Sequence, residues 1–124
     1  MTTNLGAPQV ANNQDQKEQT INDAIGRLDG AITDVLGCSI DATNTLTVSD
    51  DDFKSHAQFD CVGAGVTAAF TLIIPSVRKG LFVVSNEAGH TATIEISGQA
   101  LTPPTVADSA IALLFCDGTN VRAL

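Results

Sequence analysis

Few residues of this chain could act as a nucleophile and its base, and the best pair among them is His56 with Cys61. A thiol–imidazole pair needs the two side chains within hydrogen-bonding distance of each other. The odd separation of these residues puts them on opposite faces of an extended strand. The spacing therefore argues against a cysteine nucleophile, and we expect Cys61 to be a buried core thiol.

Metal and phosphate sites have equally little support. The acidic run Asp50–Asp52 lacks the alternating ligands and central glycine of a calcium loop, so a solvated turn is expected. His90 lies in a predicted hairpin tip, where a surface or interface imidazole is expected. Whether either feature binds an ion stays open. The glycine-rich run Val62–Gly65 precedes neither Lys-Ser/Thr nor a helix, and is expected to be a turn. We predict no catalytic residues, no metal and no cofactor.

Composition narrows the class of protein further. The 124 residues include 14 Asp and Glu against six Lys and Arg, and the net charge of -8 repels nucleic-acid phosphates. No stretch reaches the ~18 apolar residues of a membrane span, and the start lacks the features of an export signal. The three cysteines are odd in number and widely spaced, which favours buried thiols over disulfides or a zinc site. We expect synthesis in the cytoplasm, no nucleic-acid partner and no membrane insertion.

An amphipathic helix is predicted near the N-terminus. Apolar residues recur there in alternating steps of four and three, as Ile21, Ile25, Leu28, Ile32 and Val35. We predict helix over residues 15–37, capped by Asn13 or Asp15 and ended by Gly37 in a left-handed conformation. In coiled-coil terms, Ile25 and Ile32 take a positions and Leu28 and Val35 take d positions.

Two roles for this apolar stripe are open. It can pack on the chain's own β module, or it can form the interface of a homo-oligomer, for which a trimer is favoured. Gly26 and Gly30 each weaken the helix by roughly 1 kcal/mol relative to Ala, so the helix needs burial to persist. We favour self-association, with the five stripe residues as the oligomer interface.

The rest of the chain reads as β structure. After a predicted linker at residues 38–44 the hydrophobic period changes to two. Short β-rich runs separated by turn residues follow at 46–48, 56–61, 70–74, 81–85, 91–96, 110–115 and 121–124. The pattern predicts a mainly β fold with one N-terminal α-helix, in which residues 45–124 form a small antiparallel β-sandwich or jelly-roll-like module. Residues 1–14 are predicted to be a docking arm that becomes ordered on a partner.

Two segments resemble phage proteins. Residues 16–24, QKEQTINDA, followed by Leu28 and Asp29, resemble the QK-x-x-T-x-N-x-A-x-x-x-LD opening of the phage and gene-transfer-agent tail protein family DUF2793. An apolar strand ending at Pro75, the run Val84–Asn86 and the closing DGTNV of residues 117–121 resemble a β module of phage fibre and tail proteins. Relatives of this second pattern usually carry further modules after DGTNV, which puts a receptor-binding tip in doubt. Asp117–Gly118 is predicted to form a tight hairpin turn.

The resemblance implies a function. It implies a non-catalytic virion structural protein of a tailed phage or phage-like particle, a tail-fibre or tail-tip component that docks on other virion proteins through its N-terminal segment. A head decoration or head-fibre protein is the alternative within this class. A host receptor-binding module and an envelope-degrading hydrolase are rivals, which need an exposed aromatic or charged pocket and facing carboxylates, respectively. The sequence shows neither feature clearly, and it lacks Trp and Tyr.

Overall fold

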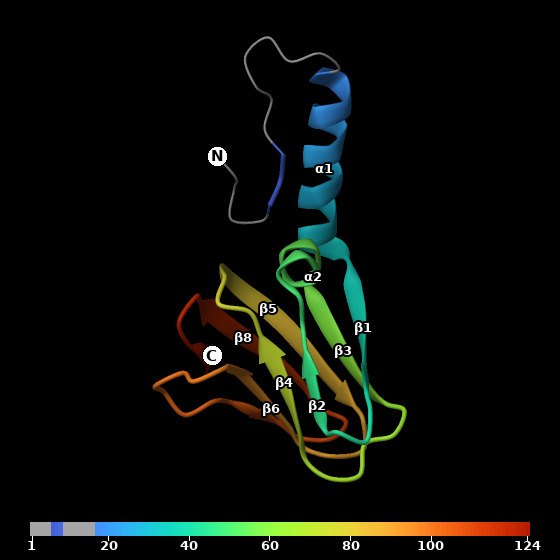
Figure 1. The fold of residues 1–124 in the computed structure, drawn as a ribbon, viewed down its shortest axis with the longest axis vertical. Helices are drawn as coiled ribbons and strands as arrows, with labels where there is room; N and C mark the ends of the chain where they lie inside the picture. Colours follow the sequence, from blue (N-terminus) through green and yellow to red (C-terminus); the bar gives the residue numbers. More distant parts are fainter. Residues whose placement is uncertain (1–5, 9–16) are drawn as a thin grey trace.

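The computed structural model describes residues 6–8 and 17–124. Within these ranges the chain is mainly β, with helix α1 (Lys17–Thr33) and the short helix α2 (Asp50–Ser55). The strands are β1 (Val35–Ile40), β2 (Thr45–Thr47), β3 (Gln58–Gly63), β4 (Phe70–Ile74), β5 (Arg78–Glu87), β6 (Ala92–Ile96), β7 (Thr105–Val106), β8 (Ile111–Asp117) and β9 (Val121–Ala123). Helix α1 projects from one end of the β module, and α2 lies at that same end, beside the C-terminal end of α1 (Figure 1). The predicted mainly β fold with an N-terminal helix is confirmed.

The strands form two sheets whose topology differs from the prediction. One sheet has the order β1-β3-β5-β8-β9 and the other has the order β2-β4-β6-β7. Strands β1, β3 and β5 are parallel neighbours, and so are β2, β4 and β6. The chain therefore passes back and forth between the sheets and stacks successive strand pairs, and β7, β8 and β9 add antiparallel edges. The sheets are mixed, so the predicted antiparallel pairing is wrong.

A short repeat explains the parallel stacking. Thr45, Thr71 and Thr93 stand in register on neighbouring strands of the four-stranded sheet, and so do Leu46, Leu72 and Ile94. In the sequence these positions belong to a Thr-Leu/Ile-x-Val/Ile pattern that occurs at residues 45–48, 71–74 and 93–96. Its apolar members face the shared core, since Leu72 and Ile94 are fully buried and Leu46 packs against them. Like residues thus stack on like residues, as in repeat architectures.

Helix α2 was not predicted. Its N-terminus is capped by the hydroxyl of Ser49, which accepts a hydrogen bond of 3.1 Å from the backbone N–H of Asp52. The acidic run Asp50–Asp52 forms the first turn, where carboxylates interact favourably with the helix dipole. The expected solvated turn at this run is therefore the start of a helix. Phe53 anchors α2 in the core, with its ring centroid 5.5 Å from that of Phe59 and 5.2 Å from that of Phe82.

Helix α1 ends earlier than the stripe predicts. The last helical hydrogen bond runs from Asp34 N to Gly30 O at 2.9 Å, and Asp34 O then accepts from Ala57 N at 2.9 Å, next to strand β3. The following residues pair in register with β3, so Val35 begins a strand and residues 38–40 of the predicted linker continue it. Gly37 lies in β1 without a positive φ and does not cap the helix. From Val35 onward, backbone N–H and C=O groups form hydrogen bonds with β3 instead of continuing the hydrogen bonds of the helix.

Other sequence features fall partly outside the described residues. The cap candidates Asn13 and Asp15 lie outside them, as does most of the predicted docking arm, of which only residues 6–8 are described. The predicted Asp117–Gly118 turn is confirmed. Gly118 has φ +92°, and Asp117 Oδ1 accepts hydrogen bonds from Thr119 N at 2.8 Å and Asn120 N at 2.7 Å. This side-chain bonding is typical of an Asx turn.

The buried amide of Asn86 joins the stacked strands to the antiparallel edge. Its position on β5 is in register with Cys61 on β3, and its side chain is fully buried. Its Nδ2 donates to His90 O at 2.7 Å and to Val106 O at 2.9 Å, while its Oδ1 accepts from Ala88 N at 3.0 Å. A polar side chain is tolerated in this core because all three bonds are made.

We expect Asn86→Ala to lower the free energy of unfolding by about 3 kcal/mol, because three hydrogen bonds of roughly 1 kcal/mol each are lost. Urea denaturation followed by circular dichroism measures this change. The control is Ser39→Ala at an exposed position of β1, for which a change within about 0.5 kcal/mol is expected. A similar, small effect of both substitutions would contradict the role given to Asn86.

Candidate oligomerisation surface on helix α1

The predicted apolar stripe is exposed in the single chain. Exposed fractions are 48% for Ile21, 61% for Ile25, 49% for Leu28 and 66% for Ile32. These four residues share one face of α1, as the 4-3 spacing predicts. The fifth, Val35, is also exposed but lies on β1, at the outer face of the five-stranded sheet rather than on the helix. The stripe is therefore not packed against the chain's own β module.

The glycine-bearing face of α1 makes the contact with the β module instead. Gly30 is the one buried residue of α1, and a Cβ built on it would lie 2.8 Å from the backbone oxygen of Ser55 at the end of α2. Such a separation is too short for any residue with a side chain to keep the present geometry. At Gly26 a Cβ would meet nothing within 4 Å. Gly30 therefore permits the close approach of the two helices, whereas Gly26 has no such role.

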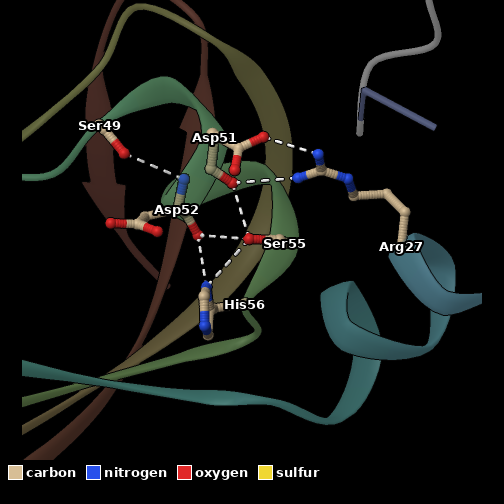
Figure 2. A network of polar contacts seen from close by, with 6 residues as sticks. All are labelled: Arg27, Ser49, Asp51, Asp52, Ser55 and His56. Carbon is tan, nitrogen blue, oxygen red and sulfur yellow. Dashed lines mark hydrogen bonds and ion pairs between the residues drawn. The ribbon is translucent and has the colours of Figure 1, made fainter. Parts of the chain in front are cut away.

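An ion pair joins α1 to α2 (Figure 2). Arg27 Nη2 lies 2.6 Å from Asp51 Oδ1, and Arg27 Nη1 donates to Asp51 O at 3.3 Å. The same backbone oxygen accepts a hydrogen bond of 2.7 Å from Ser55 Oγ. Since Arg27 and Gly30 lie on neighbouring turns of the helix, both contacts direct one side of α1 toward α2. The apolar stripe is consequently held outward.

Lys79 secures α2 to the sheet below. It is the extra residue where the register of β5 against β8 shifts between Arg78 and Gly80. Its ammonium donates to Phe53 O and His56 O, and lies 4.9 Å from the ring centroid of Phe53. Burial lowers the pKa of Lys79 to about 8. A bulge commonly redirects a side chain in this way, and here it brings a cation to the C-terminal carbonyls of a helix.

The residues considered for nucleophilic chemistry have structural contacts. His56 is the C-cap residue of α2, and its Nδ1 donates to Asp52 O at 2.8 Å (Figure 2). The predicted burial of the thiols is confirmed for Cys38, Cys61 and Cys116, and all three are free. Burial raises the pKa of Cys38 to about 11 and that of Cys61 to about 12. The thiolate, which is the reactive form, is thus disfavoured at both positions.

His90 lies in the turn after β5 and is half-buried. Strand β5 runs parallel to β3 and hence to β1, which starts beside α1, so this turn is at the far end of the module. Among residues 6–8 and 17–124, no group of three or more His, Cys, Asp or Glu side chains is arranged to hold a metal ion. In the same ranges, no helix combines the length and hydrophobicity needed to cross a membrane.

A groove of about 1060 Å³ runs beside the stripe. One wall is formed by Ala24, Ile25 and Leu28 of α1, and Ala7 and Pro8 also line the groove. The facing wall comes from the start of β5 and the β8–β9 hairpin, and contains Arg78, Lys79, Gly80, Phe115, Asp117 and Arg122. Sequence patterns did not indicate this groove, because its walls come from segments that are distant in the chain.

Comparison with protein-family models, with curated proteins and with solved structures finds no match to this chain. The resemblance of residues 16–29 to DUF2793 stays a prediction.

The two glycines of α1 offer a matched test of the joint with α2. We expect Gly30→Ala to loosen this joint, because the new Cβ must move away from the Ser55 carbonyl at a cost of roughly 1–3 kcal/mol. Gly26→Ala should instead stabilise the helix by roughly 1 kcal/mol. Amide hydrogen exchange within residues 22–33 measures both effects, and should be faster in Gly30→Ala and slower in Gly26→Ala. Equal protection of the two variants would contradict the proposed close approach.

Proposed function

We propose that this chain is a non-catalytic structural subunit that self-associates through the exposed stripe of α1, with a trimer as the favoured state. The observation that carries the proposal is the orientation of the helix. Its polar and glycine-bearing side is bound to α2, while Ile21, Ile25, Leu28 and Ile32 face solvent. A regular apolar stripe kept away from the chain's own core is typical of a surface that another chain covers.

Burial of the stripe favours self-association, but it does not contribute enough free energy to hold the copies together by itself. Covering the exposed half of each of the four side chains contributes about 1 kcal/mol apiece, or about 4 kcal/mol per copy. Association costs roughly 4–15 kcal/mol in lost translational and rotational freedom. A helix of 17 residues with two glycines therefore supports only a weak coiled coil by itself. Additional contacts between the β modules are needed.

The outer face of the five-stranded sheet can supply such contacts. Leu81 on β5 is paired with Phe115 on β8, and Leu113 is paired with Val83. Both leucines are exposed, as is Ile111 one step further along β8. The residues that alternate with them, such as Phe82 and Leu114, face the core. The apolar surface thus continues from α1 onto the sheet, next to the groove.

We place the subunit in the virion of a tailed phage or phage-like particle, as a tail-fibre or tail-tip component. This step is supported by the sequence resemblance of residues 16–29 to the tail protein family and of residues 71–121 to the fibre-type β module. In this proposal the segment before α1 docks on other virion proteins, and α1 joins identical copies. A coiled coil that groups short β modules suits a fibre, whose parts repeat around an axis.

We expect the isolated chain to be an oligomer, and light scattering should report about three chains per particle. The double substitution Ile25→Asp with Ile32→Asp should dissociate it, because association would bury unpaired charge in the interface. Circular dichroism should show that the β module remains folded, since both residues lie outside its core.

Val62→Asp is the matched control, because Val62 is an exposed apolar residue near the C-terminal end of β3, at the opposite end of the β module from α1. It should leave the mass unchanged. A monomeric mass of the unaltered chain at micromolar concentration would refute self-association.

Deletion of residues 2–13 tests the docking step. We expect the truncated chain to fold and to self-associate, because α1 and the core are retained, but no longer to join particles. Its copy number in purified particles, measured by mass spectrometry, should fall at least tenfold relative to the full chain. Incorporation at the normal copy number would show that attachment runs through α1 or the β module.

A further inference from the structure

The groove beside α1 is more basic than the rest of the molecule. Arg78, Lys79 and Arg122 line it, which is half of the six Lys and Arg residues in a chain of net charge -8. Arg122 lies 3.5 Å from Asp117, and its guanidinium is 5.7 Å from the ring centroid of Phe115. Arg78 is exposed and forms no ion pair within the described ranges. Its cross-strand neighbour is Asp117, and the charge of Arg78 helps to lower the pKa of that carboxyl group. The groove therefore has, next to an apolar wall, an exposed cation that makes no direct ion pair.

The geometry of a parallel coiled coil determines which residues of a second copy face the groove. With Ile25 at an a position and Leu28 at a d position, Ala24 occupies g and Asp29 occupies the e position that follows. In a parallel coiled coil, the g side of one helix contacts the e side of its neighbour. The groove lies on the g side, since Ala24 lines it and Asp29 does not. Asp29 of a neighbouring copy is therefore carried to the mouth of the groove.

The size and charge of that neighbour fit the groove. Two turns of α-helix, about 11 Å long and 10 Å wide, occupy roughly 850 Å³, compared with a groove of about 1060 Å³. The alanine at the g position leaves room for close approach and offers no competing charge. Asp29 is exposed and has no ion pair among the described residues, and Arg78 is its natural counterpart. The two groups are complementary in sign across the predicted contact.

We infer that the groove receives α1 of a second copy of this chain, and that Asp29 of that copy pairs with Arg78. The inference rests on the proposed self-association and specifies its second contact. The α1 helix of each chain binds in the groove of one neighbour, and its own groove binds the helix of the other neighbour. In a closed ring, every groove is therefore filled. The contact supplies the additional burial that the short stripe requires.

Charge reversal tests the pairing. Asp29→Arg and Arg78→Asp should each weaken association about tenfold in a sedimentation dilution series, because each places like charges together. The double variant should associate within about threefold of the unaltered chain. Asp23→Arg makes the same charge change at an f position away from the stripe, and combining it with Arg78→Asp should restore nothing. The unaltered contact should also weaken as salt is raised.

Cross-linking gives a second measurement that does not depend on association strength. With a short bis-maleimide that bridges the separation of an Asp–Arg pair, which is too long for a direct disulfide, a mixture of an Asp29→Cys chain with an Arg78→Cys chain should form a mixed cross-linked dimer, and neither chain should form it alone. Absence of this product, together with additive charge effects, would overturn the groove contact while leaving the stripe interface intact. A monomeric unaltered chain would overturn the proposed function itself, so the two failures are distinguishable.

Discussion

The close approach of Gly30 to the backbone of Ser55 determines which side of α1 is available to a partner. Only a residue without a side chain allows this separation, and Arg27 adds an ion pair to Asp51 on the same side. Helix α2 can receive α1 because Phe53 fixes it in the core and Lys79 binds its C-terminal carbonyls. A glycine that weakens the isolated helix thus orients it in the folded chain.

The sequence predicted the elements better than their pairing. Strand β4 was predicted with its observed bounds, and the Asp117–Gly118 turn was predicted correctly, because hydrophobic alternation and turn residues are local signals. Parallel or antiparallel pairing depends on contacts between distant segments, which alternation does not report. The threefold Thr-Leu/Ile-x-Val/Ile pattern was the available signal, and a search for internal repeats could have found it.

The apolar stripe was also predictable from the sequence, but the residue at which the helix ends and the groove beside it were not. The 4-3 spacing continues through Val35, yet the backbone of Val35 pairs with Gln58, so strand pairing overrides the helical pattern at that point. The exposure of Ile25 and Ile32 could not be derived from periodicity, which is the same for a helix packed on its own module and for one that binds a neighbour. That distinction required the position of Gly30 against α2, a contact between segments far apart in the sequence.

The junction between α1 and β1 links helix association to the orientation of the β modules. Only Asp34 separates the two elements, and its backbone closes the helix and also accepts a hydrogen bond from Ala57 beside β3. The joint with α2 braces the same end of the helix. A neighbour that associates with the stripe in parallel therefore meets a β module in a defined orientation, with its groove on the g side of the helix. In the proposed assembly, helix pairing and groove filling are one geometric event, so a stripe too short to hold copies together by itself still specifies their arrangement.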